Sequence, residues 1–164
     1  MKSFYNLVDK IYRYLNGSPS VNTVTFGNIF DVDLSKQTIF PLSHVNIQNV
    51  TFSEHVMTFA VQVICMDIVD ASKDDKLDPA SLPYRGLDNR ADVLNTQLTV
   101  INGLQSALRR GGLNDDNFVL TSDASATLFE DRFENLLSGW ALDLSIEIPN
   151  NDMQLINDTG DGCR

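Results

Sequence analysis

Apolar residues at intervals of three and four positions predict a helix between Ser3 and Asn16. Ser3 can cap the start of this helix, and the pair Asn16-Gly17 is a usual stop signal. We interpret its aromatic and aliphatic stripe as core rather than as a ligand site. The stripe consists of Phe4, Leu7, Val8, Ile11 and Leu15, flanked by Tyr5, Tyr12 and Tyr14.

A second and longer helix is predicted from near Asn89 to the basic pair before Gly111-Gly112. Asp92 near its start and the basic pair at its end both suit the helix dipole. Gly103 in its interior suggests a close approach to a sheet, because glycine disfavours helix interiors. The apolar stripe consists of Leu94, Leu98, Ile101, Leu104 and Leu108, and the basic pair is Arg109 and Arg110.

Two apolar stretches joined by a short polar turn predict a long β-hairpin, with strands at residues 45–52 and 56–69. In the second strand every odd position from 57 to 65 is apolar, whereas the even positions are mixed. One face should therefore meet a helical layer, and the other should be only partly dry. In the first strand the apolar phase shifts between Ile47 and Val50, which indicates a β-bulge.

Further strands are predicted on both sides of these elements. Within the irregular stretch 17–43, residues 21–26 and 38–40 are short strand candidates. Residues 118–122 and 126–134 follow the second helix, and strict alternation from Trp140 to Ile148 indicates a last strand that Pro149 ends. We expect an α+β fold, a mainly antiparallel β-sheet with a long hairpin, packed against two α-helices.

The chain length of 164 residues and the hydrophobic content of 43% fit one domain that buries a normal core. We place this domain at residues 1–150 and expect a flexible C-terminal arm at 151–164, where apolar residues are few. The polar stretch 70–90 is too long for a simple connection, so it is functional or disordered. No apolar run is long enough to span a membrane or resembles a signal peptide, so we expect cytoplasmic synthesis.

The formal net charge is −10, from 22 acidic against 12 basic residues. This balance argues against a protein that grips the nucleic-acid backbone, since such binding needs clustered Lys and Arg. A surface that borders DNA without holding it remains compatible with the charge.

Candidate chemistry is sparse. His44 and His55 lie beside predicted turns and are interpreted as surface residues. Cys65 is expected to be a buried thiol and Cys163 a free thiol in the tail. No nucleophile elbow, phosphate loop, dinucleotide-binding fingerprint or zinc-protease motif occurs. We therefore predict no catalytic, cofactor-binding or metal-ligating residue, no cofactor, and a protein that is not an enzyme.

Five acidic residues around the polar stretch could in principle collect around calcium, but they lack the spacing of a known calcium loop. We interpret them as solvated charges. They are Asp67, Asp70, Asp74, Asp75 and Asp78.

The features left without another interpretation are a sheet edge, two long loops and a polar arm. Such features are typical of head-to-tail association between copies. The alternative is that these segments are only loose.

Three segments carry a resemblance to a known group of proteins: MTFAVQVICMDIVD, DVLNTQLTVINGLQSALRRG and ATLFEDRFENLLSGWALDLSIEIPN, with a cysteine near the end of the chain. They resemble small structural proteins encoded among the tail genes of phages of Bacteroidetes, including crAss-like phages. The order of elements is similar to the tail-terminator and tail-completion fold. The resemblance covers about residues 1 to 150.

The resemblance implies a structural virion protein, which forms a homo-oligomeric ring of six or twelve copies in the neck or tail of a tailed bacteriophage. Such a ring caps the tail tube or joins it to the portal as a head-tail connector, and genomic DNA passes through its lumen without specific binding. It implies synthesis in the host bacterial cytoplasm, contact with other tail tube and neck proteins, and none with membranes. Residues 45–69 and 70–90 would face neighbouring subunits or the lumen.

A different class of function is suggested by Trp140, the tyrosines and the acidic stretch. These residues are also compatible with a small cytoplasmic ligand-binding or accessory module. A well-formed apolar pocket and a ligand-dependent rise in melting temperature would favour that class.

Overall fold

The computed structural model describes residues 3–70, 89–110, 113, 118–132 and 136–150. Its helices and strands follow one another in the order α1, β1, two 3₁₀ turns, β2, β3, α2, β4, β5 and β6. Their bounds are α1 Ser3–Asn16, β1 Thr23–Phe26, η1 Ile29–Asp31, η2 Gln37–Ile39, β2 Leu42–Phe52, β3 Val56–Ile68, α2 Arg90–Arg110, β4 Val119–Leu120, β5 Ser125–Arg132 and β6 Leu137–Pro149.

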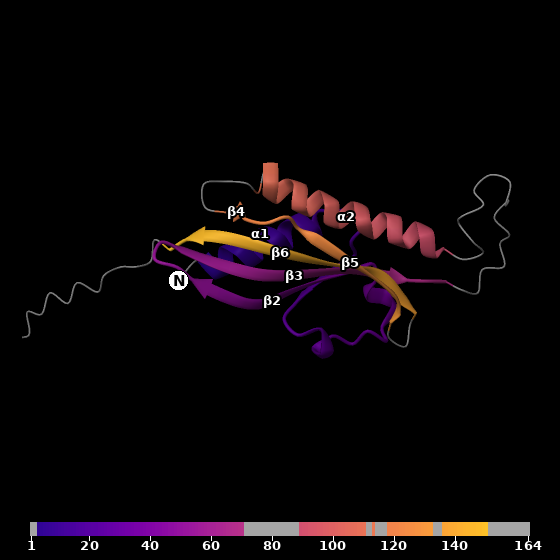
Figure 1. Cartoon of the computed structure of the whole chain (residues 1–164). Coiled ribbons are helices and arrows are strands. Elements are labelled where there is room, and N and C mark those ends of the chain that lie inside the picture. Colours follow the sequence, from indigo (N-terminus) through magenta and orange to yellow (C-terminus); the bar gives the residue numbers. More distant parts are fainter. Residues whose placement is uncertain (1–2, 71–88, 111–112, 114–117, 133–135, 151–164) are drawn as a thin grey trace, which may run out of the picture.

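The strands form one six-stranded sheet in the order β1-β2-β3-β6-β4, with β5 pairing beside β4 on the same side of β6. All pairs are antiparallel except β1 with β2. Figure 1 shows α2 lying along the strands and α1 behind them. The predicted α+β fold, with two helices on a mostly antiparallel sheet and a long hairpin, is confirmed.

The core lies between the two helices and one face of the sheet, here called the covered face. Odd positions of β3 from Met57 to Cys65 are buried there, as the alternation predicted. β6 contributes Leu142 to Ile148 at every second position, and α1 contributes three side chains with no exposed surface. Burial of this apolar stripe is what makes α1 stable, since a helix of fourteen residues is marginal alone. The three α1 residues are Leu7, Ile11 and Leu15.

The opposite face of the sheet, here called the open face, carries a smaller apolar cluster. The segment from Gly27 to Pro41 passes over one end of this face and packs against Leu42, Met66 and Phe129. The rest of the face has no helix over it among the described residues, which matches the expectation of an only partly dry face.

The hairpin was predicted correctly, although β2 begins at Leu42 rather than at residue 45. Its register shifts between Ile47 and Asn49, so Gln48 has no partner on β3 and the predicted bulge is confirmed. The bulge keeps Ile47 and Val50 on the covered face on both sides of the shift.

Three details of the sequence interpretation were wrong. Residues 38–40 are not a strand, because β1 already occupies that edge of β2 and residues 37–39 close a 3₁₀ turn. Leu98 is 41% exposed, since the buried row of α2 is one position away and contains Gln97. Gly103 faces α1 rather than the sheet, for a Cβ added there would lie 2.5 Å from Oη of Tyr14.

Residues 71–88 and 151–164 lie outside the described part of the chain, so the interpretations of the long acidic stretch and of the C-terminal arm are not addressed by the structure. In the part that is described, no helix is both long and apolar enough to cross a membrane.

Candidate functional site

One border of the sheet is formed by the second half of β2. β1 pairs with β2 only from Leu42 to Val45, and the chain then leaves the border at Gly27, whose φ is 111°. Glycine adopts this conformation without the strain that a side chain would add. Among the described residues no strand pairs with the outer side of residues 46–52, which we call the β2 edge.

Large apolar side chains gather beside the β2 edge on the covered face. Phe52 is 68% exposed, Phe26 48% and Tyr5 of α1 74%. The rings of Phe4 and Phe26 meet edge to face, with centroids 6.0 Å apart. They border a shallow hollow of about 550 Å³ along α1, which also contains Tyr12 and Arg13. Aromatic side chains exposed in this way are typical of protein contacts.

The other border of the sheet is formed by β4 and β5, which both pair with β6 on one side only. Among the described residues no strand lies against the outer side of β5, which we call the β5 edge. Val119 is 48% exposed, Leu128 43% and Leu136 42%. Thus the same sheet ends in two open borders, and both carry exposed apolar side chains.

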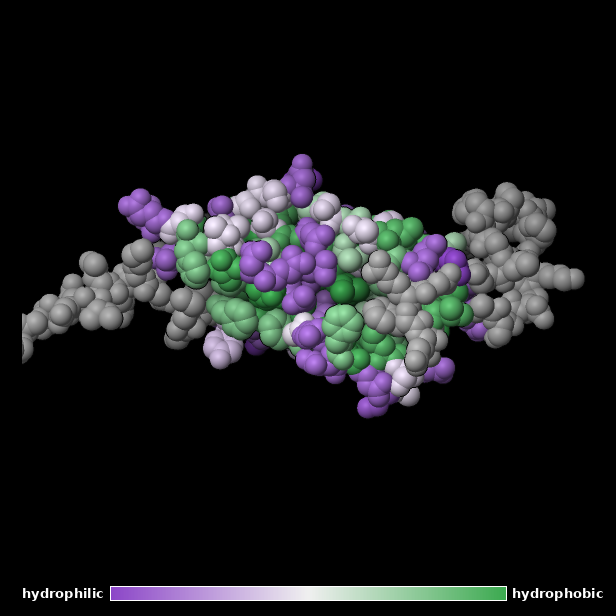
Figure 2. Space-filling view, turned by 60° about the horizontal axis from the view of Figure 1, so that its bottom comes forward, coloured by the Kyte–Doolittle hydropathy of each residue, from purple (hydrophilic) through white to green (hydrophobic). Residues whose placement is uncertain are grey.

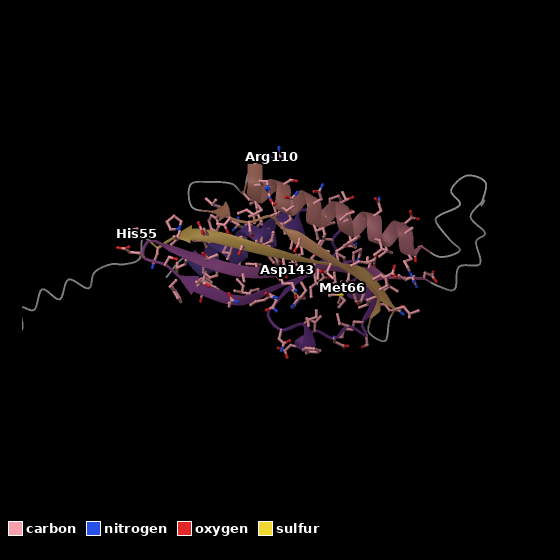
Figure 3. All side chains as sticks on the ribbon, in the orientation of Figure 1. His55, Met66, Arg110 and Asp143 are labelled. Atoms are coloured by element: carbon pink, nitrogen blue, oxygen red, sulfur yellow. The ribbon has the colours of Figure 1, made fainter. Side chains whose placement is uncertain are left out.

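Between the two edges, the middle of the open face is polar and acidic. Gln62 of β3 donates from Nε2 to Oδ1 of Asp143 on β6, at 3.0 Å. Glu147 lies four residues further along β6, on the same face of the sheet. The three long strands β2, β3 and β6 contain no Lys or Arg. Figure 2, viewed from the side of β2, shows a polar patch amid hydrophobic residues, and Figure 3 labels Asp143 midway along the strands.

Near the end of the open face there is an apolar hollow of about 250 Å³. The exposed ring of Phe30 forms part of its wall, and Gln62 is its main polar group. The remaining lining residues are Ile29, Ile64, Met66, Phe129 and Ala141. A space of this size lies below the usual range of about 300–1,000 Å³ for small-molecule sites, and its lining offers few directed hydrogen bonds.

The interpretation of both histidines as surface residues is right for one of them. His55 is exposed at the hairpin tip, as Figure 3 shows. His44 is fully buried on β2, with Nδ1 2.8 Å from Oγ1 of Thr25 and Nε2 2.8 Å from the carbonyl oxygen of Gly27. The carbonyl can only accept, so Nε2 carries a proton and Nδ1 accepts from the Thr25 hydroxyl. Burial lowers the pKa of His44, and the bond to Gly27 offsets part of this.

Two further titratable groups in the described part of the chain, Cys65 and Asp67, have shifted pKa values. Cys65 is buried as predicted, 3.2 Å from Oγ of Ser43, and burial raises the pKa of its thiol to about 12. Such a thiol stays protonated and is a poor nucleophile. Burial also raises the pKa of Asp67, while the backbone N–H of Ile68 lowers it. The described residues contain no group of three or more His, Cys, Asp or Glu that could hold a metal ion.

Of the acidic residues considered for calcium, Asp74, Asp75 and Asp78 lie outside the described residues, as does Cys163. Trp140, considered as a ligand contact, has a structural role: its Nε1 donates to the carbonyl oxygen of Leu94 at 2.9 Å and ties β6 to α2. Tyr14 is likewise packed against the core, whereas Tyr5 and Tyr12 lie beside the β2 edge.

Sequence reasoning missed which segments form the two edges, because pairing partners far apart in sequence decide this. The chemical signal was present in the runs 46–52 and 125–128, which contain no charged residue and no proline. Comparison with models of protein families gives no match, and no curated protein matches the chain.

Proposed function

We propose that this chain is a structural virion protein that assembles with copies of itself into a ring in the neck or tail of a tailed bacteriophage. As a tail terminator or head-tail connector component it lets genomic DNA pass through the lumen. In this role it is not an enzyme and works by shape and by contact between copies. The proposal joins the resemblance of three sequence segments to one structural observation, the pair of open sheet edges.

The two edges support assembly for an energetic reason. An unpaired edge leaves backbone N–H and C=O groups in water, and it is an available template for another strand. Here each edge also exposes apolar side chains, whose burial against a neighbour contributes about 25 cal/mol per Å². Because the two edges belong to different strands, contact between them is heterologous, and repeated heterologous contacts close into a ring when the rotation permits.

The charge distribution supports a lumen that does not hold DNA. The open face presents Asp143 and Glu147 and no Lys or Arg from the three long strands. A duplex beside such a face is repelled, and no counterions are released that would favour binding. The duplex would therefore slide past rather than adhere.

The test is assembly. Native mass spectrometry of the full chain from micromolar to millimolar concentration should show one closed oligomer of six or twelve copies. Electron microscopy of particles carrying a labelled copy should place the label at the neck or tail. A chain that stays monomeric throughout this range and is also missing from purified particles contradicts the proposal.

A second candidate function is a small ligand-binding module, which the apolar hollow beside Phe30 favours. In that case a panel of apolar metabolites should raise the melting temperature, and filling the hollow through Ala141→Leu should abolish the rise. No rise for any ligand, together with assembly, supports the ring.

A further inference from the structure

The lengths of the two sheet edges match. The β2 edge, residues 46–52, offers seven residues, and β5 has eight. Native edges that remain unpaired usually carry Lys, Pro or inward-pointing charges. None of these occurs in residues 46–52 or in the first five residues of β5. The bulge at Gln48 protects part of the β2 edge and leaves residues 49–52 regular, and β5 ends in the charged residues 130–132.

The directions of the strands also match. β2 and β6 are both antiparallel to β3, so they run the same way, and β5 is antiparallel to β6. A neighbouring copy placed beside the first, with its helices on the same side of the sheet, therefore brings its β5 antiparallel to β2. An antiparallel junction continues the pattern of the long hairpin.

On each face of the sheet, the side chains of β2 and β5 that would meet at this junction have the same polarity. On the covered face, β2 presents Ile47, Val50 and Phe52, and on the same face β5 presents Ala126 and Leu128, which pair with Leu142 and Trp140. On the open face, β2 presents Asn49 and Thr51, whereas β5 presents Ser125 and Thr127. Residues directly opposite in an antiparallel pair share a face, so apolar positions meet apolar ones and polar positions meet polar ones.

We infer that the subunits join by β-sheet addition, with residues 46–52 of one copy pairing antiparallel with β5 of the next copy. The exposed Phe52 then packs with Leu128 of the neighbour on the covered face. This junction rests on the proposed ring and names the surfaces that form it. Two other junctions, β2 with β2 and β5 with β5, are symmetric and would give closed dimers instead of a ring.

Disulfide trapping distinguishes these junctions. In a Cys163→Ser background, Thr51→Cys is combined in turn with Ser125→Cys, Ala126→Cys and Thr127→Cys; Cys65 stays because it is buried. Within one copy Thr51 and position 127 are separated by β3 and β6, about 14 Å at three strand spacings of about 4.8 Å. This exceeds the reach of a disulfide, so every bond formed joins two copies.

The expected result after mild oxidation is a ladder of covalent multimers on a non-reducing gel for position 125 or 127. Position 126 lies on the opposite face and should give at least tenfold less product. Reduced variants should keep the circular dichroism spectrum and oligomer size of the parent, which shows that they fold. The single variants Thr51→Cys and Thr127→Cys should give no covalent dimer.

Several results would overturn the junction. Equal yields at positions 125, 126 and 127 would exclude strand pairing, and a covalent dimer from either single variant would establish a symmetric junction. A parent that assembles while no pair cross-links would refute this junction and leave the proposed ring in place. A chain that remains monomeric and is missing from particles would refute both.

Discussion

The covered face and the edges of the same sheet differ in how far the chain completes them by itself. On the covered face, Leu7 and Leu104 from the helices meet Phe59 and Ile146 from the strands, and all are almost fully buried. At the edges Phe52 and Leu128 remain exposed, beside borders that pair with no further strand among the described residues. Stability therefore depends on the covered face and the proposed assembly on the edges, so substitutions should separate the two properties.

The largest effect on stability is expected on the covered face. Phe59 is 2% exposed within β3, and Phe59→Ala should lower the free energy of unfolding by about 3–5 kcal/mol through lost burial and a cavity. Thr58→Ala, one residue away and on the other face, is the matched control and should change it by no more than about 1 kcal/mol. Urea unfolding measures both; equal losses would show that the two faces do not differ as described.

A smaller effect of opposite sign is expected at Gln97, the one fully buried side chain of α2 with an amide. Neither Oε1 nor Nε2 has a hydrogen-bond partner among the described residues. Burying unpaired polar atoms costs about 1–3 kcal/mol, so Gln97→Met should raise the free energy of unfolding by about 1–2 kcal/mol.

Gln105→Met is the control for this gain. The Gln105 amide donates to Asn102 and Ser106, so its replacement removes satisfied bonds and should stabilise nothing. A loss of stability in Gln97→Met would mean that the amide is paired in solution.

A still smaller effect is expected from pH, through His44. Its pKa is lowered in the folded chain, so below its usual value of 6.5 the unfolded chain binds more protons than the folded one. The free energy of unfolding should fall as pH drops from 7 towards 5. Asp67 acts in the opposite sense. Its pKa is raised in the folded chain, so the free energy of unfolding falls as pH rises through this folded pKa.

The contribution of His44 is isolated by subtraction. His44→Gln should reduce the fall in the free energy of unfolding between pH 7 and 5 relative to the parent. His55→Gln, at the exposed hairpin tip, should leave this fall unchanged. A decline that persists in His44→Gln would assign the pH dependence to another group.

The smallest effect on stability, with the largest effect on assembly, is expected at the edges. Phe52→Lys and Leu128→Lys replace exposed residues, so each should change the free energy of unfolding by less than about 0.5 kcal/mol. Each should nevertheless shift the protein to monomers in native mass spectrometry. Phe30→Lys is the control, because Phe30 is even more exposed but lies on neither edge, and this variant should still assemble.

Local periodicity explains why much of the fold could be predicted. α1 was predicted with its bounds, and β3 and β6 alternate so regularly that their buried face follows from the sequence. Long-range contacts explain the misses. His44 is buried by Thr25 and Gly27, nineteen and seventeen residues away, and Leu98 is exposed because the sheet selects the row of Gln97. Likewise, pairing between segments far apart in the sequence makes residues 46–52 and 125–132 the borders of the sheet.

The short length of β1 has a mechanical consequence for a strand that docks beside it. Edge pairing is prone to slippage by two residues, because such a shift restores the same face. β1 fills the first part of β2 up to Val45, and Gly27 bonds to the Val45 carbonyl oxygen before the chain departs. An incoming strand that slid towards Leu42 would collide with this obstruction. β1 would therefore block a shift of the docked strand in this direction, and every interface between copies would have the same strand register.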